Sequence, residues 1–538
     1  MPYLNVTEVE SALQVAALSY PALCSLINLP LNSFEGRATH AVRIRGGPRV
    51  RRHGLLFIGG QHAREWGSSD ILVSLVARLL AAYANGTGLT FLGKSYTTVD
   101  VQSIVQNVDL FVYPDVNPDG KYYSQNTFAM WRRNRRPIPA TGTIGTDVNR
   151  NYDVLWDYKH YLDPVMYDGN SLNGEVVVSD VPGVDIYHGT APFSEVESQN
   201  VRWLLDTYPQ IRYFVDVHSF SQLLYYPWGD DQNQSVAPDQ NFLNPAYDGQ
   251  RGPAGGTYGE FMRAQDQARL DATAQRMNGA LNAVRGKSYA VGQSYLLYPT
   301  CGASTCYAFG RHIADTARTK LDAFLIEWGT TFQPDYATEM VNIIEDVSAA
   351  LTELCLAADR LPILDVSPRQ LNFGRLQVGT SRNRSVQLTN RGARSLTVAA
   401  VSIEAGPNAA LFTLGAAPAT LAAGATGTVP VTFTPVAAGA RGARLLIEFF
   451  EPGQAVHDVW VVPLAGDACV PVPGTCYAPV FGATNGLVCL VLFIVLIPVI
   501  VLLALFSWIP SVRCALNQLL FRLRNCGDGN DDACIPLK

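Results

Sequence analysis

The chain has 538 residues, of which 48% are hydrophobic and 16% are charged. This apolar content excludes a disordered or collagen-like protein, and the length predicts roughly two to four domains. The formal net charge of −6 provides no overall basic field for binding a nucleic acid.

Residues 1–360 alternate apolar runs with helical patterns. Four short apolar runs predict buried strands: Gly54–Gly59, Asp109–Tyr113, Tyr213–Val217 and Ala323–Ile326. Helical periodicity predicts helices at Ser69–Tyr83, Gln265–Val284 and Asp335–Leu356, and Ser11–Leu31 is expected to form the first helix. This alternation predicts an α/β domain whose mixed sheet is covered by helices on both faces. Polar insertions are expected at about 154–185 and 230–256.

Residues 361–468 are rich in Val, Thr, Ala and Gly. Short strand-like runs such as Ser385–Thr389 and Leu445–Phe449 are separated by turn residues about every ten positions. This pattern predicts an all-β immunoglobulin-like sandwich. The segments Leu371–Gly374 and Val431–Pro435 resemble the immunoglobulin-like modules related to major sperm protein, and this domain carries no catalytic constellation of residues.

The C-terminal region predicts a membrane anchor. After a linker at 469–485, the stretch 486–508 contains no charged residue and is long enough for one transmembrane helix. Arg513, Arg522 and Arg524 lie in the short tail at 509–538, so the positive-inside rule places this tail in the cytoplasm and the large domains outside. No clear signal peptide is seen, because Ser11–Leu31 follows acidic residues and contains prolines. A leader upstream, another export route and a cytoplasm-facing enzyme therefore stay open.

The ten cysteines lack the paired spacing of a structural zinc site. Three pairs are close in sequence: Cys301 with Cys306, Cys469 with Cys476, and Cys526 with Cys534. Such pairs are compatible with disulfides in an oxidising compartment, although the sequence proves none of them.

Candidate metal ligands follow the predicted strands. His62 and Glu65 lie three residues apart just after the first strand, and His218 follows another strand. An isolated pair of this kind is often a coincidence. However, two His and one Glu leave a fourth position open for water, which is the arrangement of a catalytic zinc. Glu327 ends a third strand, and active sites of α/β sheets lie at the carboxyl ends of strands.

Together these motifs resemble the zinc carboxypeptidases of the carboxypeptidase A type. The resemblance covers about residues 3–356 and follows the family's order of motifs. Besides the residues above, it rests on the segments Ser33–Arg37, Tyr113–Gly120, Trp131–Arg132, Asp147–Asn151, Tyr187–Glu195 and His218–Gly229.

The resemblance implies a role for each matching residue. His62, Glu65 and His218 are the implied ligands of one zinc ion. Glu327 is the implied general base, and Arg132 is implied to polarise the scissile carbonyl. The implied substrate-binding residues are Arg64, Asn149, Arg150, Tyr298 and Thr305. Bidentate guanidinium groups suit recognition of a C-terminal carboxylate.

Several of these residues could instead have an ordinary structural role. Arg132 lies in a basic loop, Arg150 could form a surface ion pair, and Tyr298 could be a packing residue. Asp230, Asp231 and Asp239 could bind calcium, but a polar insertion loop is the better interpretation. Thr305 stands at the family's specificity position and carries no charge, so neutral or apolar C-terminal residues are the expected substrates.

The leading hypothesis is a membrane-anchored, zinc-dependent metallocarboxypeptidase that hydrolyses the C-terminal peptide bond of peptides or proteins, with the sandwich as a spacer or docking module. The alternative is a non-catalytic peptide-binding or adhesion protein on a carboxypeptidase scaffold. A third hypothesis is an amidase-like relative that acts on cell-wall peptides. Asn149 and Arg150 favour a free α-carboxylate and hence a carboxypeptidase.

Overall fold

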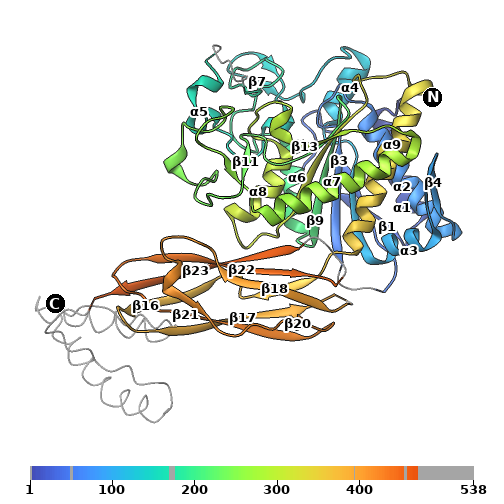
Figure 1. Cartoon of the computed structure of the whole chain (residues 1–538). Helices are drawn as coiled ribbons and strands as arrows, with labels where there is room; N and C mark the ends of the chain where they lie inside the picture. Colours follow the sequence, from blue (N-terminus) through green and yellow to red (C-terminus); the bar gives the residue numbers. More distant parts are fainter. Residues whose placement is uncertain (1–2, 49–51, 169–175, 393, 453–456, 471–538) are drawn as a thin grey trace, which may run out of the picture.

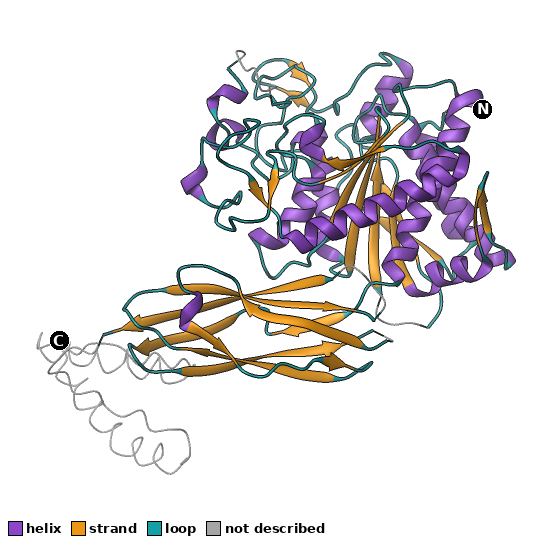
Figure 2. Ribbon diagram, in the orientation of Figure 1, coloured by secondary structure: helices purple, strands orange, loops and turns teal. Residues whose placement is uncertain are grey.

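The computed structural model describes residues 3–48, 52–168, 176–392, 394–452 and 457–470. They form an α/β domain followed by a domain built almost wholly of strands (Figures 1 and 2). The α/β domain and the immunoglobulin-like domain of the predicted fold class are therefore confirmed. The predicted transmembrane helix at 486–508 and the tail at 509–538 lie outside the described residues.

A mixed eight-stranded sheet forms the centre of the first domain. Its strand order is β1-β2-β6-β3-β9-β14-β10-β13. The four central strands, β6, β3, β9 and β14, run parallel, whereas β2 and β10 pair antiparallel with this central group. The strand bounds are β1 Cys24–Asn28, β2 His40–Ile44, β3 His53–Gly59, β6 Val108–Tyr113, β9 Ile211–Ser219, β10 Leu223–Tyr226, β13 Ala290–Gln293 and β14 Asp322–Trp328.

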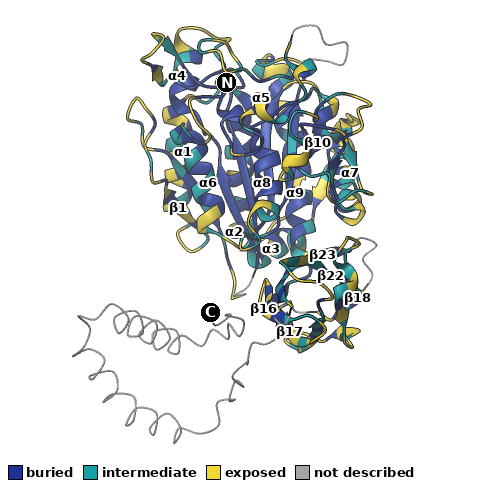
Figure 3. Ribbon diagram, turned by 90° about the vertical axis from the view of Figure 1, so that its left-hand side faces the viewer, coloured by how far each residue is buried: buried dark blue, intermediate teal, exposed yellow. Residues whose placement is uncertain are grey.

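The four strands predicted from apolar runs are the four central strands. Almost every residue in them is buried, as the dark blue interior of Figure 3 shows. A strand that is covered on both faces has no polar side, which explains its continuous apolar sequence.

Helices cover both faces of this sheet. Figure 1 shows α6 and α8 on one side, and α2 and α9 on the other with α7 packed along α9. The helix bounds are α1 Val6–Ser19, α2 Gly67–Asn85, α3 Thr98–Asn107, α4 Pro118–Asn126, α5 Tyr158–Tyr161, α6 Val196–Thr207, α7 Ala264–Arg285, α8 Ser304–Ala314 and α9 Val341–Asp359. Three two-stranded hairpins or pairs complete the domain: β4 Leu89–Phe91 with β5 Lys94–Tyr96, β7 Pro137–Ile138 with β8 Thr143–Ile144, and β11 Asn233–Gln234 with β12 Glu260–Phe261.

The expected single helix over Ser11–Leu31 is wrong. The helix α1 begins after a capping box formed by Asn5 and Glu8, and it ends at Ser19. Pro21 follows the end of the helix, and the chain then continues as the edge strand β1. The helix expected from Asp335 also differs, because a π-helical turn over Tyr336–Met340 precedes α9.

The second domain is a sandwich of two sheets. One sheet has the order β15-β17-β21-β19 and the other β16-β23-β22-β18-β20. Apolar side chains from both sheets form one core, with Phe373, Phe412 and Phe433 in mutual contact. The bounds are β15 Leu364–Ser367, β16 Leu371–Gln377, β17 Arg382–Asn390, β18 Leu396–Ile403, β19 Phe412–Leu414, β20 Thr420–Leu421, β21 Thr426–Phe433, β22 Arg441–Phe450 and β23 Asp458–Cys469.

Within the described ranges, α2 is the one helix whose length and apolar composition would allow it to cross a membrane. Most of its apolar stretch is buried in the first domain, where the helix packs against α1, α3 and α9.

Candidate active site

Three strand ends bring the candidate residues to one edge of the sheet. His62 lies three residues beyond the end of β3, and His218 and Glu327 lie near the ends of β9 and β14. In the register of β9 with β14, Glu327 stands directly beside His218. Because these strands are parallel, their carboxyl ends meet, as the sequence analysis expected.

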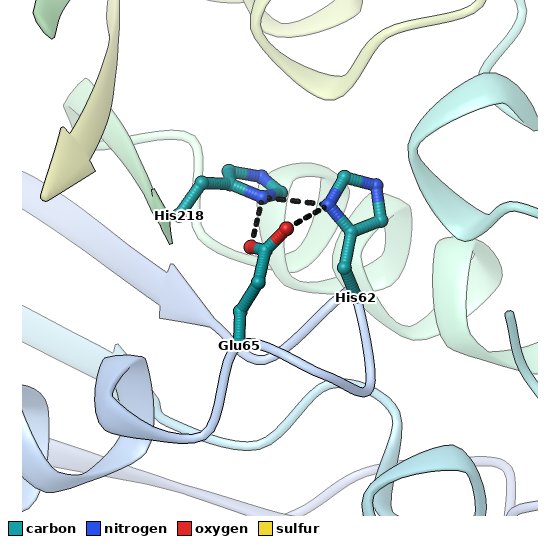
Figure 4. Close-up of side chains that lie close together, drawn as sticks. All are labelled: His62, Glu65 and His218. Carbon is teal, nitrogen blue, oxygen red and sulfur yellow. Dashed lines mark hydrogen bonds and ion pairs between the residues drawn. The ribbon is translucent and has the colours of Figure 1, made fainter. Parts of the chain in front are cut away.

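The three candidate ligands converge on one point (Figure 4). The Nδ1 atoms of His62 and His218 lie 3.0 Å apart. One carboxylate oxygen of Glu65 lies 2.8 Å from Nδ1 of His62, and the other lies 2.8 Å from Nδ1 of His218. Each of the three side chains is at least 95% buried. The turn that holds Glu65 is closed by its backbone N–H, which donates to the carbonyl of His62.

A buried carboxylate lies behind each imidazole. The Nε2 atom of His62 lies 3.1 Å from Asp147, and that of His218 lies 2.8 Å from Asp216. A carboxylate beside each Nε2 favours the tautomer that carries its proton on that atom, which leaves the two Nδ1 atoms, 3.0 Å apart, with lone pairs for a metal. Two facing lone pairs beside a carboxylate repel one another unless a cation lies between them. The donor set of two imidazoles and one carboxylate therefore suits Zn²⁺.

Asp147 and Asp216 are functional residues that the sequence analysis did not single out. Asp147 also binds Arg132, whose Nε donates to one carboxylate oxygen at 2.9 Å and whose Nη2 lies 2.8 Å from the same oxygen. Burial alone would raise the pKa of Asp147, but Arg132 and then His62 hold it well below the usual range. Asp216 accepts hydrogen bonds from Ser304 and Gln61. Both carboxylates are thus fixed by several donors and orient the rings.

Glu327 is positioned to act as a base beside the three ligands. Its side chain is 8% exposed, and burial raises its pKa to about 8 against the opposing effect of His218. Repulsion from the carboxylate of Glu65 adds to this increase. A cation bound by His62, Glu65 and His218 would lower this pKa, because it favours the charged carboxylate.

The residues expected to bind substrate lie around this centre. Arg150 is 2% exposed, and its guanidinium carbon lies 5.8 Å from the ring centre of the half-buried Tyr298. The amide nitrogen of Asn149 lies 3.4 Å from Nε2 of His218, while its oxygen accepts the backbone N–H of Ser304. Thr305 is buried in the first turn of α8. The structure thus brings Asn149, Arg150 and Tyr298 to the same side of the zinc ligands.

The other arginines of the basic loop differ from Arg132 in their partners. Arg136 donates to the backbone carbonyl of Ser194, whereas Arg133 and Arg135 stack on the ring of Trp131. Only Arg132 binds the carboxylate that supports a candidate zinc ligand.

The acids of the second insertion serve its own folding. Asp231 accepts the backbone N–H groups of Gln232 and Gly252, both at 2.6 Å. Asp239 accepts a hydrogen bond from the hydroxyl of Tyr247. In the part of the chain that the structure describes, the one His, Cys, Asp and Glu cluster with metal-ligand geometry is His62, Glu65 and His218. Cys301 and Cys306 are buried free thiols.

Comparisons with known proteins agree with this geometry. A family model described as zinc carboxypeptidase matches residues 9–333. A model described as HYDIN/CFA65/VesB-like, Ig-like domain matches residues 362–457.

Two curated relatives illustrate the sequence similarity. Carboxypeptidase B of Astacus astacus is 31% identical over 312 residues, which cover 57% of this chain and 82% of that protein. Carboxypeptidase A4 of Mus musculus is 28% identical over 298 residues, which cover 55% of this chain and 57% of that protein. The chain thus spans little more than half the length of the mouse relative.

A solved structure shows the same fold for the first domain. The crystal structure of thrombin activatable fibrinolysis inhibitor is 20% identical, with a TM-score of 0.50. The alignment covers 66% of this chain and 74% of that one.

Proposed function

This chain belongs to the zinc carboxypeptidase family, whose model matches more than half of its length, and we propose that it hydrolyses the C-terminal peptide bond of peptides or proteins. The observation that carries the proposal is the convergence of His62, Glu65 and His218, with Asp147 and Asp216 behind the imidazoles and Glu327 beside them. A zinc ion held there would supply a water of lowered pKa and would polarise a carbonyl.

Two neighbouring residues carry out the proton transfer and stabilise the transition state. The carboxylate of Glu327 takes the proton of the attacking water and passes it to the leaving amine. Arg132 is held by Asp147, and its guanidinium stabilises the negative charge that develops on the carbonyl oxygen in the transition state.

Arg150 supports the requirement for a free C-terminal carboxylate. Its Nε and Nη1 donate to the carbonyls of Val177 and Asn149, but its Nη2 has no hydrogen-bond partner among the described residues. A buried cationic donor without a partner destabilises the free protein. The terminal carboxylate of a substrate would supply this partner.

The side chain that the enzyme removes is proposed to be neutral or apolar. Two acids near Thr305 in sequence lie away from it: Asp315 follows the far end of α8, and Asp322 at the start of β14 binds Arg269. Asp230 is closer, since it follows Gly229, where an added Cβ would lie 3.3 Å from Sγ of Cys306. Matched peptides ending in Phe and in Arg test this proposal. A higher kcat/KM for the Arg peptide would overturn the neutral pocket and would point to Asp230 as the residue that binds the basic side chain.

The membrane attachment is also a proposal. It is supported by the uncharged stretch 486–508 and by the arginines that follow it, which together favour a single-pass protein whose catalytic domain lies outside the cytoplasm. Protease added to intact cells would then remove the catalytic domain, whereas its complete protection would contradict the proposed topology.

The metal assignment is tested by metal analysis together with product analysis. The purified protein should contain one zinc per chain and release C-terminal amino acids from a peptide library. His218→Ala should lose both properties. Full peptidase activity in a His218→Ala protein that contains no zinc would refute the proposed centre.

A further inference from the structure

A cluster of arginines lies on the part of the site formed by the turn of the zinc ligands and by the loop of Arg132. We call Arg64, Arg133 and Arg135 the arginine rim. Arg64 lies between His62 and Glu65 in sequence, and Arg133 follows Arg132. Their side chains are largely buried, with exposed fractions of 16%, 9% and 15% in chain order. Three guanidinium groups therefore gather at one place on a protein whose net charge is −6.

The rim is held by aromatic rings rather than by strong ion pairs. The guanidinium carbon of Arg64 lies 4.2 Å from the ring centre of Phe332, and that of Arg133 lies 4.6 Å from Trp131. Arg135 lies 3.8 Å from the ring of Tyr123. Stacking fixes the guanidinium planes but leaves their edges free to donate.

Several donors of the rim lack hydrogen-bond partners. In the described residues, no acceptor bonds Nε of Arg64, Nε and Nη1 of Arg133, or Nε of Arg135. The acidic neighbours of Arg133 and Arg135 lie beyond hydrogen-bond distance: a carboxylate oxygen of Asp185 lies 3.7 Å from Nε of Arg133, and one of Glu35 lies 3.7 Å from Nε of Arg135. Asp185 does accept a long hydrogen bond, of 3.4 Å, from Nη1 of Arg64. A buried guanidinium group without acceptors is a site where an added carboxylate gains strong hydrogen bonds.

Asp185 lies against two arginines of the rim. It lies 3.4 Å from Nη1 of Arg64 and within 3.7 Å of Arg133, and its side chain is 52% exposed. It belongs to the predicted insertion at 154–185, which also reaches Arg150 through the carbonyl of Val177. One carboxylate thus faces two arginines at more than ideal distance, and an exposed side chain can move aside.

The rim lies apart from the residues that hold the terminal carboxylate. Arg64 contacts Phe332, and its backbone carbonyl accepts from Gln333. Arg150 instead contacts Val177 and lies against the backbone of Gly302. A peptide whose C-terminus reaches Arg150 and whose scissile bond lies at Arg132 would extend its upstream residues toward the other side, where the rim is.

We propose that the arginine rim selects substrates with acidic side chains in the first residues upstream of the scissile bond, and that Asp185 competes with those side chains for Arg64 and Arg133. The proposal rests on the proposed peptidase function and adds the substrate class to it. Since the rim is charged and partly open to water, the selection should weaken as ionic strength rises.

The test uses three peptides that share one C-terminal residue and carry Glu, Gln or Lys upstream of the scissile bond. The full-length protein should cleave the Glu peptide with a kcat/KM about fivefold or more above that of the Gln peptide, and the Lys peptide should be slowest. The ratio of kcat/KM for the Glu peptide to that for the Gln peptide should fall toward one in high salt. Equal values for all three peptides at low salt would overturn the proposal.

Substitutions then assign the effect to the rim. Arg133→Gln should lower the ratio of kcat/KM for the Glu peptide to that for the Gln peptide. Arg133→Lys, which keeps the charge, should lower this ratio less. Asp185→Asn should raise the ratio, because the competing carboxylate is gone. Arg202→Gln is the matched control, since Arg202 also stacks on a ring, that of Phe193 at 4.4 Å. A ratio unaffected by Arg133→Gln would contradict the assignment.

Binding is measured separately from cleavage. Fluorescence anisotropy of the same peptides, labelled and mixed with the Glu327→Gln protein, should show that the Glu peptide binds most tightly and the Lys peptide most weakly. If no peptide is cleaved but the Glu peptide binds most tightly, the proposed peptidase function fails, and the rim binds acidic peptides without selecting substrates. If the peptides are cleaved and bound without regard to charge, only the rim proposal fails.

Discussion

Glu327 shares its side of the sheet with His218, and both are nearly free of contact with water. Its carboxylate is not one of the three candidate ligands, which form their own cluster without it. Its proposed role is therefore to move a proton, and a neutral side chain of the same shape should leave the metal in place.

Glu327→Gln should retain one zinc per chain and bind substrate, while kcat falls by about three powers of ten or more, because the acceptor for the water proton is missing. Metal analysis and steady-state kinetics on the same preparation check this. An increase confined to KM would show that Glu327 only binds substrate.

The sequence allowed the cluster of candidate zinc ligands and the neighbouring Glu327 to be predicted, but it gave no role to Asp147 and Asp216, which lie behind the imidazoles. His62 and Glu65 form a recognisable spacing after an apolar run. Asp216 is a single acid inside another apolar run and resembles an interruption of the strand. A signal was available, since Asp216 and His218 are two residues apart in a strand and so point to the same face. A buried Asp beside a candidate His ligand is a typical partner.

The elements differ in how well their sequences predict them. The central strands β3, β6, β9 and β14 have no polar face, so their apolar runs are conspicuous. The edge strands β1 and β13 are short and half-exposed, and neither was predicted. Their hydrogen bonds to neighbours distant in sequence, rather than their own residues, make them strands.

Helix α6 contains a buried acid that should make stability depend on pH. Burial, and then repulsion from Glu195, raise the pKa of Glu197 to about 8, although Asn134 donates a hydrogen bond to it. The folded protein therefore holds a proton there at pH values where the unfolded chain does not. Stability from this group is complete below the ordinary Glu pKa and is lost as pH rises through the folded value.

Glu197→Gln removes this titration while keeping the shape of the side chain. The free energy of unfolding of the variant minus that of the wild type should increase as pH rises from about 5 to about 8, by at most about 1.4 kcal/mol per pH unit, and then level off. Thermal melts of the two proteins across this range measure the difference. A difference that stays constant with pH would mean that Glu197 is ionised throughout.

The two domains share a buried network of charges at the end of the sheet opposite the active site. Arg212, Arg269 and Lys320 of the first domain contact the carboxylate of Asp458 at the start of β23, at 2.8, 3.4 and 3.3 Å. Among the described residues, the first domain supplies two carboxylates to this network, Asp266 and Asp322. Asp458 therefore neutralises a third buried cation. The sandwich is a structural partner of the catalytic domain, which sequence reasoning could not foresee because the pairing joins residues 138 positions apart or more.

Asp458→Asn should destabilise the protein by about 3–5 kcal/mol, because it leaves buried cations without their partner. Asp467→Asn is the matched control on the same strand, where Asp467 and its partner Arg375 are both 44% exposed and the expected change is below about 1 kcal/mol. Denaturant unfolding of the whole protein compares them. Equal stability of the two variants would show that the interface contributes little.

The requirement for both zinc and a free C-terminal carboxylate tests the central claim most directly. One peptide is prepared with a free C-terminus and with an amidated C-terminus, and each is incubated with the purified protein before mass spectrometry. The account predicts that residues are removed only from the C-terminal end of the free peptide, that a chelator abolishes this, and that added zinc restores it. Internal cleavage, equal cleavage of the amidated peptide, or activity that survives complete removal of zinc would contradict it.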